Sequence, residues 1–186
     1  MSDDFLHDQG KSLVEAFFVK ENSEVLRRYQ DKQATAAQVA ELKQATGIQD
    51  EAALQHLAEK KISAPTIAAF GLYPLIAVAW ADGKIDEAER DAILKAADQK
   101  GLTKGSPAYE TLLNWLKTQP DPSLFDVWEE YAQALGKAIG EPHKSVLKQQ
   151  TIAKAREVAE AAGGFLGIRS ISDAEQKLLD RLDKSL

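Results

Sequence analysis

The stretch VAWADGKIDEAER, residues 78–90, contains the signals that decide the fold of this chain. It begins as an apolar helix and then places a glycine and four acidic residues close together, namely Asp82, Asp86, Glu87 and Glu89. Gly83 is suited to end a helix, because glycine adopts positive φ without strain. Asp86 and Glu89 have the spacing of a capping box, in which two side chains bind the free backbone amides at a helix start. The stretch is therefore predicted to be a helix end followed directly by a capped helix start.

Similar helix signals recur along the chain, and strand signals are nearly absent. Predicted helix starts fall at Thr35, Asp50, Ser106, Pro142 and Ser172, and predicted helix ends at Gly47, Gly101 and Gly140. We therefore predict an all-α bundle of about nine to eleven short helices. A soft boundary near residue 60 divides a helical N-terminal extension, 1–60, from the main helical domain, 61–186.

The composition indicates which kinds of partner the protein binds and in which cellular compartment it is expected. The formal net charge is −6 and no Lys/Arg-rich run is present, so nucleic acids and anionic membrane surfaces are not expected to bind. Cations and basic proteins are the more natural ligands of such a chain. The absence of cysteine and of a secretory signal pattern at the N-terminus favours a cytoplasmic location.

One uncharged segment, residues 62–81, is about as long as a membrane span. Pro65, Gly71 and Pro74 divide it into two short pieces, and much of it is alanine, which drives membrane insertion weakly. We therefore expect two buried core helices rather than a transmembrane helix.

The opening stretch has a second copy near the C-terminus. VAWADG, residues 78–83, aligns with VAEAAG, residues 158–163, and IDEAE, residues 85–89, aligns with ISDAE, residues 171–175; seven of these eleven positions are identical. Two copies that are about 80 residues apart suggest a bundle of two pseudo-repeated halves. The second copy has Ala162 where the first has Asp82, and its turn is enlarged to GGFLGIRS.

The stretches LIAVAWADGKIDEAERDAIL and VAEAAGGFLGIRSISDAEQKLLDRL resemble the TerB-like family, helical domains named after a tellurite-resistance protein. The resemblance covers roughly residues 65–186. It implies an all-α domain of two related halves in the bacterial cytoplasm, linked to tellurite and stress-response systems. It also implies an acidic cluster that binds a divalent cation or a partner.

The acidic turn itself permits two interpretations. As a capping box, Asp86 and Glu89 only satisfy backbone amides. As a cation site, Asp82, Asp86 and Glu89 would hold calcium or magnesium weakly, with Asp91 as a further candidate ligand. An EF-hand register matches only in its second half, because its first and third places fall on apolar residues. Asp82 is the residue that capping leaves unexplained; Lys84, backbone amides or an ion could satisfy its carboxylate.

Other candidate sites carry weaker signals. Phe165, Leu166 and Ile168 in the GGFLG loop are predicted to contact a protein partner. His7, His56 and His143 lack paired ligand spacing and are expected at the surface, whereas Trp80, Trp115 and Trp128 are expected in the core. No nucleophile motif occurs. We therefore expect a non-enzymatic module that binds a protein partner, with no certain cofactor and a possible homo-oligomer; a cation sensor or buffer is the alternative.

Overall fold

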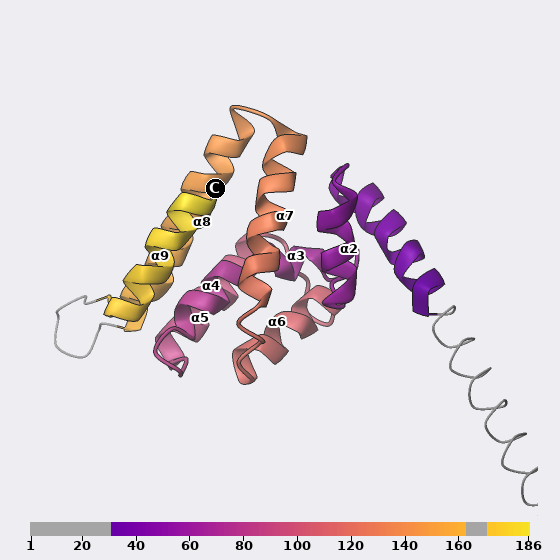
Figure 1. Cartoon of the computed structure of the whole chain (residues 1–186). Helices are drawn as coiled ribbons and strands as arrows, with labels where there is room; N and C mark the ends of the chain where they lie inside the picture. Colours follow the sequence, from indigo (N-terminus) through magenta and orange to yellow (C-terminus); the bar gives the residue numbers. More distant parts are fainter. Residues whose placement is uncertain (1–30, 163–170) are drawn as a thin grey trace, which may run out of the picture. The chain divides into compact units, whose positions relative to one another are not determined.

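The computed structural model describes residues 31–162 and 171–186, and all regular structure in these two ranges is helical (Figure 1). Residues 31–46 form one helix. The eight helices that follow are α2 (Glu51–Glu59), α3 (Ile67–Phe70), α4 (Tyr73–Ala79), α5 (Glu87–Gln99), α6 (Pro107–Lys117), α7 (Leu124–Ile139), α8 (His143–Ala162) and α9 (Asp173–Ser185). The prediction of an all-α bundle of about nine to eleven helices is confirmed for these residues, which form nine.

The predicted helix starts are mostly those of the structure. The side chains of Asp50 and Ser106 accept hydrogen bonds from the backbone amides at the third positions of α2 and α6, as N-cap residues do. The predicted start at Thr35 is wrong, because Thr35 lies inside the helix over residues 31–46. Its hydroxyl donates a hydrogen bond to the carbonyl oxygen of Asp31, one turn earlier in the same helix, at 2.9 Å. The hydroxyl therefore has its partner within the helix and does not cap a helix start.

The chain divides into two compact units, Met1–Ala37 and Gln38–Leu186. The second unit contains all the numbered helices, and it begins 23 residues before the Lys61 at which the main domain was expected to start. The difference arises because α2 packs against α7 and buries Leu54 and Leu57 completely. These contacts make α2 part of the main unit.

The uncharged segment forms α3 and α4, which lie at the centre of the second unit. Phe70, Tyr73, Leu75 and Ile76 are each at most 2% exposed, so this segment supplies much of the hydrophobic core. Among the described residues, no helix combines the length and the apolar character needed to cross a membrane.

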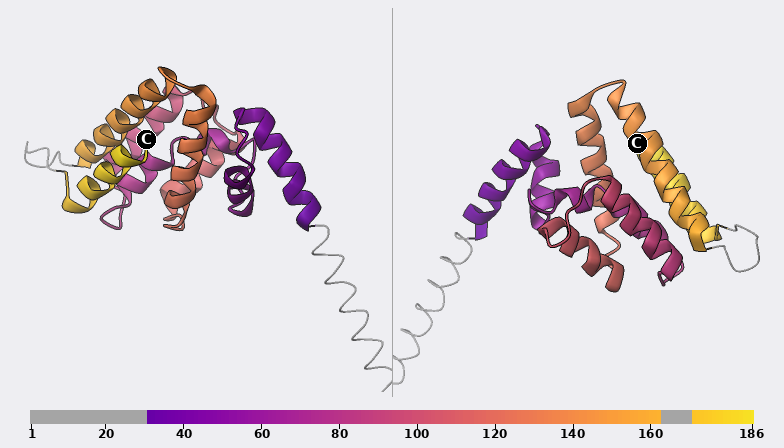
Figure 2. Two further views of the ribbon diagram at one scale, coloured as in Figure 1. Left: turned by 45° about the horizontal axis from the view of Figure 1, so that its top comes forward. Right: turned by 180° about the vertical axis from the view of Figure 1, so that it is seen from behind.

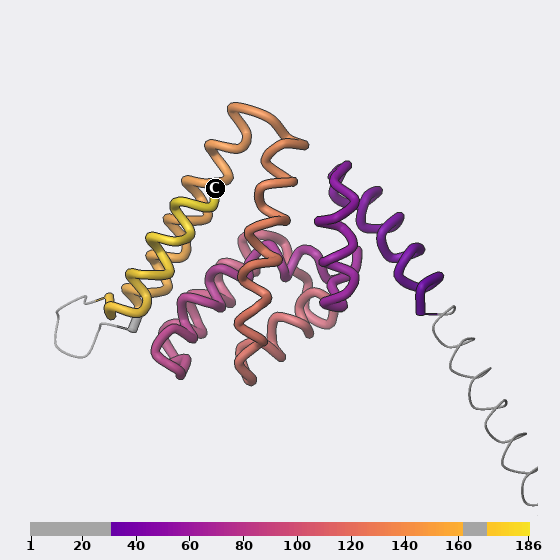
Figure 3. Tube along the Cα trace, viewed as in Figure 1, coloured from indigo at the N-terminus to yellow at the C-terminus, as the bar shows by residue number. Residues whose placement is uncertain are grey.

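The two sequence copies form two helix pairs, α4–α5 and α8–α9. Helix α5 packs along α8, and α4 packs against both α8 and α9. In a bundle of two equivalent halves, the contact of α5 with α8 corresponds to the contact of α9 with α4, and both contacts are present. Both views of Figure 2 show α9 beside α8, and in Figure 3 the two helices run in opposite directions.

Candidate functional site

The acidic turn between α4 and α5 contains a complete capping box. The Asp86 carboxylate accepts from the Glu89 amide at 2.9 Å, and the Glu89 carboxylate accepts from the Asp86 amide at 2.9 Å. Glu89 is only 4% exposed. Two of the three predicted metal ligands are therefore bound to backbone donors of the helix that they begin.

Asp82, the residue that capping did not explain, is exposed and satisfied locally. Its carboxylate accepts a hydrogen bond from the backbone amide of Lys84 at 3.1 Å, which is the geometry of an Asx turn. Gly83 between them has φ of 91°, a value that residues with a β-carbon rarely adopt. Of the partners considered for Asp82, the backbone amide is the one that the structure provides.

The predicted cation ligands do not form a metal-binding group. In residues 31–162 and 171–186, no three His, Asp or Glu side chains lie close enough together to hold a metal ion. Asp82, Asp86 and Glu89 share one turn, but each has a backbone amide as its partner.

The second sequence copy forms the same kind of capping box at the start of α9. The Ser172 hydroxyl accepts from the Glu175 amide at 3.2 Å, and the Glu175 carboxylate accepts from the Ser172 amide at 2.6 Å. Glu175 is 5% exposed, and Glu89 and Glu175 are the two buried charged residues of the described part of the chain. The repeat thus buries one capping glutamate in each half.

Glu89 is buried and lies close enough to Glu175 for the charge of Glu175 to affect its pKa. Burial raises the pKa of Glu89 from 4.5 to about 7, because desolvation disfavours the carboxylate. The negative charges of Asp86, Glu175 and Asp82 raise this pKa further, while the hydrogen bond from the Asp86 amide opposes the shift. Glu89 is therefore a half-protonated group near neutral pH in the folded protein.

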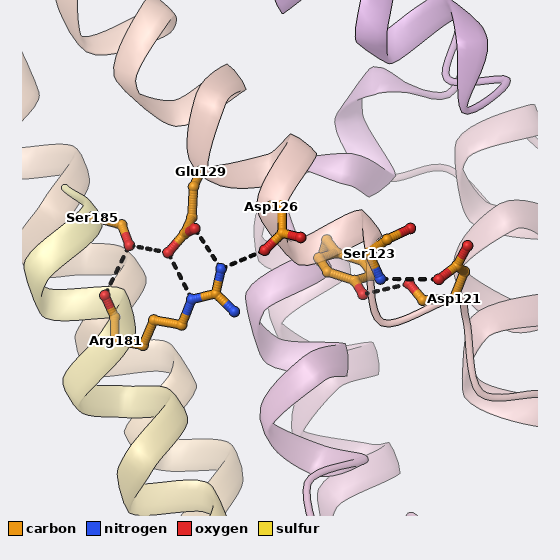
Figure 4. Close-up of polar contacts among 7 residues, drawn as sticks. Asp121, Ser123, Asp126, Glu129, Arg181 and Ser185 are labelled. Atoms are coloured by element: carbon orange, nitrogen blue, oxygen red, sulfur yellow. Dashed lines mark hydrogen bonds and ion pairs between the residues drawn. The ribbon is translucent and has the colours of Figure 1, made fainter.

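A polar network that the sequence did not indicate joins α9 to α7 (Figure 4). The Arg181 guanidinium donates to Asp126 at 2.6 Å and to both carboxylate oxygens of Glu129, at 2.5 and 2.9 Å. The Ser185 hydroxyl also donates to Glu129. The guanidinium carbon lies 4.5 Å from the centre of the Phe125 ring, which adds a cation–π contact. Because its partners are acidic, the pKa of Arg181 is raised and the side chain stays charged.

Asp121 and Ser123, also shown in Figure 4, fix the turn before α7. The Asp121 carboxylate accepts from the Ser123 amide at 2.9 Å, and Lys60 donates to the Ser123 hydroxyl at 2.6 Å. Hydrogen bonds from the Ser123 amide and hydroxyl to Asp121, together with the nearby Lys60 charge, lower the pKa of Asp121. The pair is structural in character, because each group is satisfied by a neighbour in the turn or by the end of α2.

The other residues considered in the sequence analysis are dispersed. His56 on α2 lies 2.5 Å from Glu130 on α7, and this hydrogen bond raises the pKa of His56. His143 is exposed at the start of α8, and Trp128 is 3% exposed in the core. The predicted contact residues Phe165, Leu166 and Ile168, together with His7, lie outside the described residues.

No model of a protein family, no curated protein and no solved structure matches this chain.

Proposed function

We propose that this chain is a non-enzymatic, TerB-like interaction module of the bacterial cytoplasm that binds a protein partner in a stress-response or tellurite-resistance type of system. The repeated arrangement of an alanine-rich helix, a turn and a capped helix supports this assignment. The link to stress or tellurite comes from the family resemblance alone.

The observation that carries the proposal is the exposed acidic surface held in place by the capping box. Asp82, Glu87 and Asp91 are exposed, while Asp86 and Glu89 fix the backbone beneath them. Glu87 and Asp91 are four residues apart on α5 and so lie on one helical face. We call Asp82, Glu87 and Asp91 the acidic face.

A rigid group of carboxylates suits a partner with a complementary basic surface. Such charge complementarity speeds association and selects the partner, and it does not require a catalytic pocket. A partner that uses this surface would bind less tightly as salt screens the charges. The contribution of Phe165, Leu166 and Ile168 to the same surface stays a prediction.

The proposal is tested by affinity capture from the native cell, comparing the wild type with a variant that neutralises the acidic face, Asp82→Asn with Glu87→Gln and Asp91→Asn. The matched control neutralises three other exposed carboxylates, Glu41→Gln with Asp98→Asn and Glu110→Gln. We expect the wild type and the control to retain the same partner in a salt-sensitive manner, and the acidic-face variant to retain several-fold less. Equal capture by both variants would refute the proposed surface.

A further inference from the structure

A cavity of about 570 Å³ lies between α3, α4, the C-terminal end of α5, α7 and α8. Its apolar floor consists of Leu72, Leu75, Trp128, Tyr131 and Ala132, each at most 9% exposed. A volume of this size is typical of small-molecule sites, which run from roughly 300 to 1,000 Å³ and are mostly apolar. The cavity is separate from the acidic face, so the inference drawn from it does not depend on the proposed function.

The polar residues that line the cavity carry no negative charge. They are Gln99 and Lys100 at the end of α5, and Gln150, Thr151 and Lys154 on α8. Gln99, Lys100 and Gln150 are exposed, so the cavity opens to solvent on this side. The absence of Asp and Glu from the described lining is informative, because the whole chain has 29 of them against 23 Lys and Arg.

The two lysines that line the cavity, Lys100 and Lys154, differ in whether their charge is already paired. Lys154 forms an ion pair with Glu157 on the same helix, at 2.6 Å, which offsets its charge. Lys100 has no ion pair with any residue in the described ranges. A ligand with one negative charge would therefore meet an available cation at the end of an apolar cavity.

We propose that this cavity binds a medium-chain carboxylic acid, with the hydrocarbon chain against Trp128 and the leucines and the carboxylate at Lys100. Transfer of the ligand's hydrocarbon chain from water to the apolar floor of the cavity supplies the affinity. The carboxylate stays at the solvent-exposed rim, where it keeps part of its hydration and gains an opposite charge. A neutral or cationic molecule of the same length gains only the first of these two terms.

Trp128 provides a specific reporter of occupancy. Its indole N–H is a buried donor with no acceptor among the described residues, whereas the Trp80 indole donates to the carbonyl oxygen of Trp115 at 2.8 Å. The three tryptophans give three indole N–H signals in a ¹H–¹⁵N correlation spectrum, and a ligand in the cavity changes the surroundings of Trp128.

The experiment is a titration of the full chain with decanoate, decanol and decylamine below their aggregation concentrations, followed by the tryptophan indole signals. Conservative Trp→Phe variants assign the three signals. We expect decanoate to shift the Trp128 signal selectively and to bind several-fold more tightly than decanol or decylamine. No selective shift of this signal, or equal binding of all three probes, would overturn the proposal.

Two variants test the assigned positions. Lys100→Gln should weaken decanoate binding about threefold to fivefold, as for one exposed ion pair, and should leave decanol binding unchanged. The control is Lys117→Gln on α6, which should change the binding of neither decanoate nor decanol. Ala153→Phe adds a ring at an exposed lining position of α8, outside the core, and should reduce binding of decanoate and decanol alike. Unchanged decanoate binding in both Lys100→Gln and Ala153→Phe would place the ligand elsewhere and refute the inference.

Discussion

Replacing Glu89 with glutamine should stabilise the protein at alkaline pH and leave it nearly unchanged at acid pH. Glutamine has the same shape as a protonated glutamate, and its carbonyl oxygen can still accept the hydrogen bond from the Asp86 amide. The substitution therefore preserves the capping box and removes only the buried charge. This separates the cost of the charge from the benefit of the cap.

The size of this stability difference follows from the pKa of Glu89. Folding raises it from 4.5 to about 7, so the folded state binds the proton more tightly than the unfolded state. The stability that protonation gives is fully present below about pH 4.5 and is lost as the pH rises towards 7. At about 1.4 kcal/mol per pKa unit, the loss between about pH 5 and pH 8 amounts to about 2.5 kcal/mol.

The assay is urea denaturation of the wild type and Glu89→Gln at about pH 5 and about pH 8. The difference in unfolding free energy between the two proteins should grow by about 2.5 kcal/mol over this range, with the variant more stable at the higher pH. Comparing the two proteins cancels the contribution of other titrating groups such as His56. Glu87→Gln, at an exposed position on the same helical turn, is the control and should show no such growth.

The reasoning is refuted if the wild type and Glu89→Gln have parallel pH profiles. That result would mean that Glu89 is ionised in the folded protein at the same pH as in the unfolded chain.

Three further outcomes are expected. Arg181→Lys should lower the unfolding free energy by about 1 kcal/mol, because lysine keeps the charge but loses the bidentate pairing and the ring contact; urea denaturation measures it, and no loss would contradict the network. Ser172→Asp keeps an N-cap but adds a carboxylate beside Glu175, so it should lower the melting temperature at neutral pH more than at acid pH. Millimolar calcium or magnesium should not shift the melting temperature, and a shift of several degrees would instead support a cation site at the acidic turn.

Local features of the fold could be predicted from the sequence because helix caps depend on residues close in sequence. Asp50, Asp86, Ser106 and Ser172 each satisfy an amide three residues later, so the residue type and its place before a helical stretch indicate them. Thr35 had the same spacing and failed, because a threonine hydroxyl can also bond to the preceding turn within a continuing helix. Spacing is thus necessary for a cap, but tertiary structure decides whether it is used.

The rest of the candidate site depends on contacts between residues far apart in the sequence. Arg181 meets Asp126 and Glu129 across more than 50 positions, and neither helix signals that pairing on its own. The lining of the cavity is likewise assembled from five helices, α3, α4, α5, α7 and α8. The internal repeat was the exception, because it predicted two related halves, and the charge of Glu175 in the second half affects the pKa of Glu89 in the first.

The two copies of the acidic turn also differ in charge. Each half buries a capping glutamate, so identical copies would add two further carboxylates near each buried one. The first copy has these carboxylates, Asp82 and Asp86, and both raise the pKa of Glu89. The second copy has Ala162 and Ser172 at the equivalent positions, and neither carries a charge. Serine still caps the helix, so the second half keeps the architecture while limiting the negative charge around the two glutamates.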